Sequence, residues 1–246
     1  MSGACTVVTG ASSGIGAAVA ARLLARGENV VAVARRADVL AKLYGDSPNA
    51  VCAAVDLESP DATARVATAV KERFDTVRGF VHAAGFVSPA PLGLVQDETA
   101  HRLFSVHALF PLQFLGWLAK RPNHADGAAA AVLVSSLAAH EGDCGNAAYA
   151  AAKGAVEGLL RPAAAELAPR GVRVNAVVLG VVDTPMAQGS WMVRCTPEQI
   201  DARRARYPLG FGTPEKVADV IDFFLGEASA WITGQCLVAD GGHQLT

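Results

Sequence analysis

Short apolar runs rich in valine and alanine alternate with longer segments of helical periodicity along almost the whole chain. Parallel strands need crossover connections, and helices in those crossovers bury both faces of the sheet, so the strands become apolar throughout. The pattern therefore predicts a doubly wound α/β fold with seven parallel strands and helices on both faces. The strands are expected at residues Cys5–Val8, Val30–Ala34, Ala50–Val55, Gly79–His82, Ala130–Ser135, Val172–Leu179 and Gln235–Val238.

Helical periodicity predicts helices over Ala17–Arg26, Asp61–Phe74, Glu98–Ala119, Ala147–Leu167 and Glu215–Leu225. Two of them follow Ser59-Pro60 and Thr213-Pro214, residue types that favour the N-cap and the first turn. Pro162 lies within the fourth helix and predicts a kink, because proline removes one backbone hydrogen bond. No linker divides the chain, so residues 1–246 are expected to form a single domain. Residues 180–214 lack regular periodicity and are expected to be a substrate loop or lid.

The composition narrows the class of partner. The 246 residues are 52% hydrophobic, enough for one large core, and their formal net charge is only −2. This balance disfavours nucleic acid, because phosphate binding needs a strongly basic surface. The five cysteines are far apart with no C-x-x-C pair, so neither a disulfide framework nor a metal site is expected. Without a signal sequence or a bilayer-spanning apolar run, we expect a cytoplasmic protein that binds a small molecule and no membrane.

The segment "TGASSGIG", residues 9–16, lies between the first expected strand and the first expected helix. Its glycines at positions 10, 14 and 16 permit a tight turn and a close approach of a ligand to the backbone. The helix that follows offers free N–H groups and the positive end of its dipole to a phosphate. This position favours a pyrophosphate cradle over an ordinary loop, although the spacing is G-x-x-x-G-x-G rather than G-x-G-x-x-G.

Further along the chain stand Ser136, Tyr149 and Lys153, within "VSSLAAHEGDCGNAAYAAAK", and the C-terminal segment "ITGQCLVADGG". Together with the glycine-rich turn, these motifs resemble the short-chain dehydrogenase/reductase family, in particular its 3-oxoacyl-carrier-protein reductases, over the whole chain. The resemblance implies a Rossmann-type fold and an oxidoreductase that uses a nicotinamide cofactor. It also implies a homotetramer or homodimer, in which the helices near residues 98–119 and 147–167 pack against their symmetry mates.

Tyr149 and Lys153 are four residues apart on one expected helix, so their side chains share a face. A phenol with a pKa near 10 is a poor acid–base group at neutral pH, and a neighbouring ammonium is expected to lower that pKa. The resemblance implies that Tyr149 donates a proton to a carbonyl, Ser136 donates a hydrogen bond to the same oxygen, and Lys153 modifies the tyrosine pKa and binds ribose. Ser135 is the adjacent alternative, but strand alternation points it to the opposite face. A structural tyrosine beside a solvated lysine is the other interpretation, and the combination of motifs disfavours it.

Two arginines, Arg35 and Arg36, end the second expected strand, "NVVAVARR". In the family this strand end faces the adenosine ribose, where an acidic residue binds the hydroxyls of NAD. The corresponding residue is Ala34, so no carboxylate is expected to repel the 2′-phosphate of NADP. Arg35, helped by Arg36, is expected to bind that phosphate, which predicts NADP(H) as the cofactor. Alternatively, both arginines are merely solvated on a loop.

After the third expected strand, Asp56-Leu57 resembles the adenine-binding pair of the family more than a helix cap, because Ser59 already fits the cap. The resemblance implies a cofactor-binding set that spreads over five loops and the expected helix at residues 147–167. Its members are Gly10, Ser12, Ser13, Gly14, Ile15, Gly16, Arg35, Arg36, Asp56, Leu57, Ala83, Ala84, Gly85, Tyr149, Lys153, Gly180, Val182 and Thr184.

The chain departs from the family pattern at three places. "HAAG", residues 82–85, stands where the family usually has N-N-A-G, and Leu179 stands where proline usually precedes the glycine. His107, in "FSVHALF", aligns with the asparagine that completes the catalytic tetrad of the family. Either His107 takes the place of that asparagine in a proton relay, or it is a helix histidine that faces elsewhere. The sequence does not orient it.

The substrate is less defined. The resemblance places a largely apolar set near it, which favours a hydrophobic or cyclic ketone. Three arginines in "DARRARYP" could meet a carboxylate or a carrier-bound phosphate, but a charged face on a lid helix is usually solvated, so they are given no role. The favoured function is NADPH-dependent reduction of a ketone to an alcohol. The alternatives are an NAD-dependent alcohol or dihydrodiol dehydrogenase working oxidatively, and a cofactor-binding protein that no longer catalyses, which only His107 favours. The apolar set is Phe86, Leu137, His140, Cys144, Trp191, Met192 and Val193, and the arginines are Arg203, Arg204 and Arg206.

Overall fold

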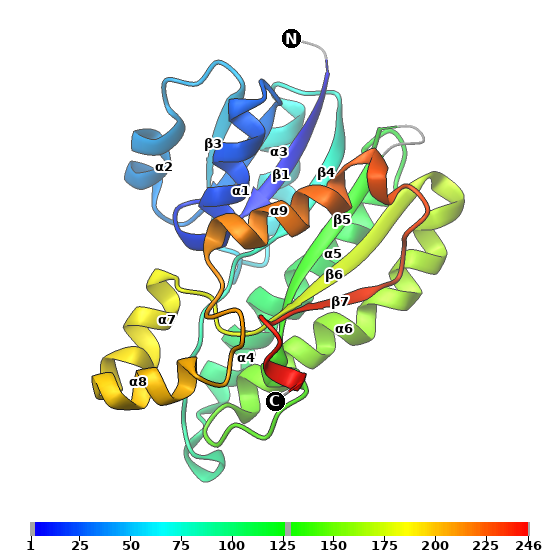
Figure 1. Ribbon diagram of the computed structural model, residues 1–246. Helices are drawn as coiled ribbons and strands as arrows, with labels where there is room; N and C mark the ends of the chain where they lie inside the picture. The colour runs from blue at the N-terminus through cyan, green and yellow to red at the C-terminus, as the bar shows by residue number, and fades with distance from the viewer. Residues whose placement is uncertain (1–2, 126–128, 246) are drawn as a thin grey trace.

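The computed structural model describes residues 3–125 and 129–245 and contains one sheet of seven parallel strands (Figure 1). The strand order is β3-β2-β1-β4-β5-β6-β7, so the predicted doubly wound parallel sheet is confirmed. The order reverses between β1 and β4, which is where open α/β sheets bind ligands. The strands are β1 (Ala4–Thr9), β2 (Val30–Ala34), β3 (Ala50–Ala54), β4 (Thr76–His82), β5 (Ala129–Ser136), β6 (Val172–Leu179) and β7 (Cys236–Ala239).

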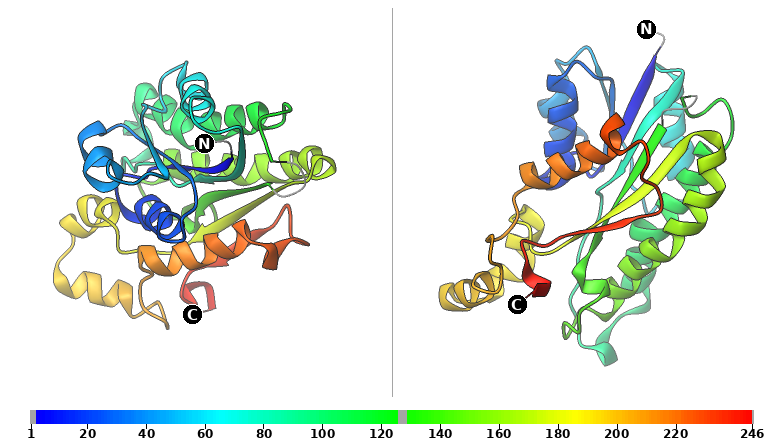
Figure 2. Two further views of the ribbon diagram at one scale, coloured as in Figure 1. Left: turned by 90° about the horizontal axis from the view of Figure 1, so that it is seen from above. Right: turned by 45° about the vertical axis from the view of Figure 1, so that its right-hand side comes forward.

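Helices cover both faces of the sheet, as the view from above in Figure 2 shows. One face packs against α1, α2 and α9, and the other against α3, α5 and α6. In the part of the chain that the structure describes, no helix is long and apolar enough to cross a membrane. The helices are α1 (Gly14–Ala25), α2 (Ala37–Tyr44), α3 (Ala62–Lys71), α4 (Asp97–Phe104), α5 (Phe110–Leu118), α6 (Ala147–Leu167), α7 (Pro185–Ser190), α8 (Pro197–Arg204) and α9 (Pro214–Leu225).

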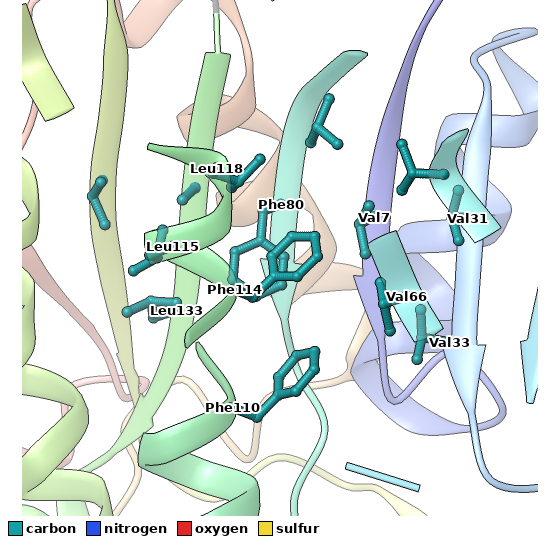
Figure 3. Packing of buried hydrophobic residues seen from close by; sticks show 14 of the residues in the cluster. Val7, Val31, Val33, Val66, Phe80, Phe110, Phe114, Leu115, Leu118 and Leu133 are labelled. Carbon is teal, nitrogen blue, oxygen red and sulfur yellow. The ribbon is translucent and has the colours of Figure 1, made fainter. Parts of the chain in front are cut away.

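The core on the α3, α5 and α6 face is built from alternate strand residues and an aromatic cluster (Figure 3). Phe80 of β4 lies against Phe114 of α5, with ring centres 4.5 Å apart, and Phe110 and Phe114 are stacked at 5.8 Å. All three rings are almost fully buried. Removing apolar rings of this size from water stabilises the fold by roughly 1.5–3 kcal/mol each, which fixes α5 on the sheet below the site.

The helix predicted over Glu98–Ala119 is interrupted. Helix α4 passes at Ser105–Leu109 into a π-helical turn, which leads directly into α5. His107 lies at the centre of this turn, where the wider backbone frees carbonyl groups from the regular helical bonds. Pro162 is accommodated inside α6, which continues to Leu167.

Two helix starts test the predicted caps. Thr213 caps α9 as predicted, because its side chain accepts a hydrogen bond from Lys216 N (3.4 Å). Ser59 was predicted to cap the helix after β3, and this was wrong: Asp61 holds that position in α3, without a side-chain cap bond. A turn at residues 56–62 separates β3 from α3. The Ser59 hydroxyl donates to Asp61 Oδ1 (2.5 Å) and does not accept a bond from the first turn of the helix.

The segment at residues 180–214 is more regular than predicted, since it contains both α7 and α8. These helices are short, and α8 has charged residues around its circumference, so apolar periodicity does not reveal them. Thr196 and Gln199 form a reciprocal capping box that fixes the start of α8. Figure 1 places both helices beyond the carboxyl ends of the strands, where the predicted lid should lie. Helix α2 was not predicted at all, because its eight residues are too few for a clear period.

Candidate active site

A cavity of roughly 420 Å³ opens at the carboxyl ends of the strands, with α7 and the residues after it in its outer wall. The cavity is lined by the glycine-rich turn, the strand ends and helix α6. It therefore connects the predicted cofactor region with the predicted catalytic region. Nearly all of the predicted site residues line this cavity. They are Gly10, Ser12, Ser13, Gly14, Ile15, Arg35, Arg36, Asp56, Leu57, Ala83, Ala84, Gly85, His107, Ser136, Tyr149, Lys153, Gly180, Val182 and Thr184.

The turn between β1 and α1 has the shape of a phosphate cradle. Gly10 has φ +72°, and a Cβ there would lie 2.9 Å from Ala83 O, so only glycine fits. Helix α1 begins at Gly14, its N-cap Ser13 makes no side-chain cap bond, and no acidic residue lies in its first turn. Free N–H groups and a positive dipole end therefore face the cavity and fit a pyrophosphate. Gly16 does not line the cavity. A Cβ there would lie 2.5 Å from Gly10 O, so glycine is needed for the first turn of α1 to pack against the glycine-rich turn.

Arginines surround the region beyond the end of β2. Arg36 Nη2 donates to Ser12 Oγ (2.8 Å), which ties it to the glycine-rich turn, whereas Arg35 is exposed. The expectation that no carboxylate lies here was wrong, because Glu58 Oε1 is 4.0 Å from Arg35 Nη1. Glu58 enters from the loop after β3, and the alignment with β2 could not reveal it. Arg102 donates two hydrogen bonds to Glu58 (2.7 and 3.1 Å), so this carboxylate is already paired.

Ser136, Tyr149 and Lys153 meet where β5 ends and α6 begins. Lys153 is buried, its Nζ donates to Val134 O (2.8 Å), and the same atom lies 5.7 Å from the centre of the Tyr149 ring. The Ser136 Oγ accepts a hydrogen bond from Ala138 N (3.2 Å), which leaves its own proton free to donate into the cavity.

The neighbouring Ser135 is engaged elsewhere. Its hydroxyl donates to Glu157 Oε1 (2.6 Å), and the other oxygen of Glu157 lies 2.8 Å from His140 Nε2. Ser135 therefore has no free proton for a substrate, whereas Ser136 has one, as strand alternation suggested.

Burial dominates the acid–base properties of the pair on α6. It raises the pKa of Tyr149 to about 12, against the opposing effect of a hydrogen bond with Ser136. The predicted lowering of the tyrosine pKa by Lys153 is therefore not found: burial raises this pKa, and the group that opposes burial is Ser136. Burial also lowers the pKa of Lys153 to about 7, although the carboxylate of Glu157 acts in the opposite direction. Tyr149 is thus a protonated phenol at neutral pH.

His107 faces the site rather than pointing elsewhere. It is fully buried, its ring centre lies 5.3 Å from that of Tyr149 in an edge-to-face arrangement, and its Nε2 lies 2.9 Å from Phe86 O. Among the described residues its Nδ1 has no hydrogen-bond partner. A Cβ on Gly85 would lie 2.2 Å from the His107 ring, so the last residue of "HAAG" must be glycine for this histidine to fit.

His82, the first residue of "HAAG", is a second fully buried histidine beside the site. Its Nδ1 lies 3.0 Å from Thr9 Oγ1, and its Nε2 has no hydrogen-bond partner within the described ranges. Burial, and next the charge of Lys153, lowers the pKa of His82 to about 3, and the same two causes lower that of His107 well below 6.5. Both imidazoles are therefore neutral at physiological pH.

These two histidines should make the protein acid-labile. Below pH 6.5 the unfolded chain binds a proton at each of them, whereas folded His82 binds none until about pH 3, so stability falls as the pH falls through this window. We expect His82→Asn and His107→Asn each to remove about 1.4 kcal/mol of the stability lost between about pH 7.5 and 5.5. Urea unfolding at both pH values measures this, with the exposed His101→Asn as the control. An unchanged pH dependence in both variants would contradict it.

The substrate end of the cavity lies beside α7. Of the predicted apolar set, Phe86, Leu137 and Trp191 line it, whereas His140, Cys144, Met192 and Val193 do not. Further lining residues from the lid and from the loop between β5 and α6 were not predicted or were given no role, and five of them carry polar side chains. They are Glu141, Asp143, Asn146, Arg203 and Tyr207. Among the described residues, no cluster of His, Cys, Asp and Glu side chains could hold a metal ion.

Comparison with known proteins agrees with this geometry. The family model described as enoyl-(acyl carrier protein) reductase matches residues 10–244. The chain is 36% identical over 243 residues to cis-4-hydroxycyclohexanecarboxylate dehydrogenase of Sinomonas cyclohexanicum, covering 96% of this chain and 95% of that protein. It is 34% identical over 248 residues to L-xylulose reductase of Bos taurus, covering 100% and 98%. The crystal structure of a short-chain dehydrogenase/reductase from Brucella melitensis superposes with a TM-score of 0.89 at 29% identity, covering 98% and 96%.

Fold and cavity together define a nicotinamide-dependent oxidoreductase with a Rossmann-type sheet. The chain belongs to the short-chain dehydrogenase/reductase family, whose members act on alcohols and ketones.

Proposed function

We propose that this protein is an NADPH-dependent carbonyl reductase that converts a ketone to an alcohol, with Ser136, Tyr149 and Lys153 as its catalytic residues. The observation that carries the proposal is that these three side chains line the same cavity as the phosphate cradle. A group held at the cradle and a carbonyl at Tyr149 would then share one enclosed space, as group transfer requires.

The chain supplies the proton and the hydrogen bonds of the reaction. When bound, a reduced nicotinamide supplies a hydride to the carbonyl carbon. Tyr149 donates its proton to the carbonyl oxygen, and Ser136 donates a hydrogen bond to that oxygen while charge develops on it. Lys153, with a pKa lowered to about 7 by burial, is partly charged at neutral pH and stabilises the phenolate that Tyr149 leaves. Solvent then returns one proton to Tyr149.

The reductive direction is favoured by the state of the tyrosine. Burial raises the pKa of Tyr149 to about 12, so at neutral pH the group is the protonated phenol that reduction needs, whereas oxidation needs it as a phenolate.

NADP(H) is favoured by the charges at the adenosine end of the cavity. Arg35 and Arg36 both line the cavity, and the carboxylate of Glu58, 4.0 Å from Arg35, is also bound by Arg102 through two hydrogen bonds.

The second candidate is an NAD-dependent alcohol or dihydrodiol dehydrogenase. Glu58 favours it, because a carboxylate beside Arg35 could bind the ribose hydroxyls of NAD. A panel of cyclic and open-chain ketones, assayed with NADPH and NADH at equal concentration, separates the two. We expect a higher kcat/KM with NADPH. Preference for NADH would favour the second candidate, and no turnover with either nucleotide would reject both.

Arg35→Ala tests the assignment of the 2′-phosphate. A charge-assisted hydrogen bond contributes about 1.5–3 kcal/mol, so the variant should raise the KM for NADPH by about tenfold or more and leave that for NADH nearly unchanged. Arg65→Ala is a matched control, because Arg65 lies on α3, the helix that follows the edge strand β3, but does not line this cavity. Equal losses for both nucleotides in Arg35→Ala would refute the assignment.

We further propose a cytoplasmic homotetramer or homodimer. Leu109 and Leu112, at the start of α5, are about half exposed, which supports a contact between helices of two copies. Analytical ultracentrifugation of the wild type and of Leu112→Glu tests this surface.

A further inference from the structure

The lid carries one side chain whose chemistry the proposed reaction does not use. Arg203, in the last turn of α8, lines the cavity, whereas its neighbour Arg204 does not. The Arg203 guanidinium lies 4.7 Å above the centre of the Trp191 ring, which also lines the cavity, and its side chain is 34% exposed. Of the two interpretations of this arginine, a solvated helix face or a contact with an anionic group of the substrate, its place in the cavity wall favours the second.

Arg203 is the cation of the substrate end. The other lysine and arginine residues in the described cavity wall are Arg35 and Arg36, at the adenosine end, and Lys153, which donates to a backbone carbonyl beneath Tyr149. The Trp191 ring beneath Arg203 is itself held by an edge-to-face contact with Phe211. The apolar side chains of Phe86, Leu137 and Trp191 beside one guanidinium are complementary to an apolar molecule that carries one anionic group.

The pairing of Arg203 leaves hydrogen-bonding capacity for such a group. Its Nη2 donates one hydrogen bond to Asp143 Oδ2 at 3.2 Å, and the Tyr207 hydroxyl is a second side-chain partner, so part of the five-donor guanidinium is still available. Arg26 and Asp222, by contrast, form a two-bond fork with both distances 2.6 Å. Asp143 is 41% exposed at the rim, so it can turn to solvent when another carboxylate arrives.

The second acidic group near this end is already paired. Glu141 Oε1 lies 3.0 Å from Nε2 of the buried His243, so its charge faces the C-terminal segment. The guanidinium, partly shielded from water between Trp191 and the rim, therefore interacts more strongly with an anion than an exposed surface arginine does.

We infer that Arg203 is a specificity-determining residue that binds a carboxylate on the substrate, so the preferred substrates are apolar or cyclic oxo acids and the corresponding hydroxy acids. This inference rests on the proposed function, because it names the substrate of the same site. Asp143 acts as a gate that competes with the substrate carboxylate for the guanidinium.

A pair of ligands of the same shape tests the inference by binding rather than turnover. Cyclohexanecarboxylate and its neutral amide, cyclohexanecarboxamide, are titrated calorimetrically into the enzyme saturated with NADP⁺. We expect the wild type to bind the acid at least about tenfold more tightly than the amide. Arg203→Met should reduce this preference by at least about tenfold, Arg203→Lys should reduce it less, and Asp143→Asn should increase it several-fold.

Arg204→Met is the matched control, because Arg204 also lies over an aromatic ring, that of Phe211 at 4.5 Å, but outside the cavity. It should leave the preference for the acid unchanged. A lid damaged by Arg203→Met would weaken both ligands equally, and the ratio of the two affinities detects this. Equal affinities of the wild type for acid and amide, no binding of the acid, or equal losses in Arg203→Met and Arg204→Met would overturn the inference.

Turnover of 4-methylcyclohexanone in the same preparations tests the proposed function separately. Its reduction, together with a wild type that does not prefer the acid, would reject the role of Arg203 alone. A preference for the acid without any ketone turnover would reject the reductase and retain the carboxylate site.

Discussion

Tyr149→Phe is expected to lower kcat for ketone reduction by about 100-fold or more while the enzyme still binds NADPH. The substitution keeps the ring, which packs edge-to-face on His107 with centres 5.3 Å apart, and deletes only the hydroxyl that donates the proton. General acids contribute roughly 10²–10⁴-fold to such reactions. Because burial raises the pKa of Tyr149 to about 12, the lost group is a neutral phenol and the fold loses no charge.

Steady-state kinetics with the best ketone, and quenching of protein fluorescence by NADPH, measure the two effects independently. Tyr44→Phe is the control for the loss of a buried tyrosine hydroxyl, because burial also raises the pKa of Tyr44 to about 12, and its hydroxyl donates to Ala11 O of the glycine-rich turn (2.7 Å) rather than into the cavity beside Ser136 and Lys153. It should lower stability by about 1 kcal/mol and leave kcat within about threefold. If Tyr149→Phe retained more than about a tenth of the wild-type kcat, Tyr149 would not be the general acid.

The fold was accessible from sequence because its signal is distributed. The inner strands of a doubly wound sheet are buried on both faces, so the run at β2 is apolar throughout and that at β6 is apolar except for Arg173 and Asn175, and both have the predicted bounds. Short elements lack this redundancy. Helix α8 is stabilised by a capping box and charged residues, and α2 has only eight residues, so neither presents an apolar period long enough to detect.

The site was predictable only where the chain carries a motif. The glycine-rich turn and the Tyr149–Lys153 pair are local in sequence, and their spacing already fixes which side chains can meet. Glu58 reaches the cavity from the loop after β3 and Arg203 from helix α8 of the lid, and the paths of both segments depend on tertiary packing, so nothing near these residues in the sequence marks their role. The tyrosine pKa was misjudged for a related reason, since burial depends on the whole fold, whereas the neighbouring lysine is visible in the sequence.

The orientation of His107 was left open by the sequence, and its placement in the structure makes it a test of the proton relay. Its Nε2 lies 2.9 Å from Phe86 O and 3.3 Å from Phe86 N, and one nitrogen cannot serve both groups at once. The shorter contact favours donation to the carbonyl, which leaves Nδ1 as a buried acceptor. This acceptor is close to Lys153, because the lysine charge is the second cause, after burial, that lowers the pKa of His107. It can therefore bind a water molecule that carries protons.

We therefore expect His107→Leu to lower kcat by roughly tenfold or more, with little change in NADPH affinity, because leucine offers no acceptor and leaves the Phe86 backbone unpaired. His107→Asn should remain active, since its amide both donates and accepts. The solvent deuterium isotope effect on kcat should rise in His107→Leu, because proton return becomes limiting, and a purely structural defect would not raise it. His101→Leu, at an exposed position of α4, is the control. Full activity of His107→Leu at every pH would show that the imidazole takes no part in proton transfer.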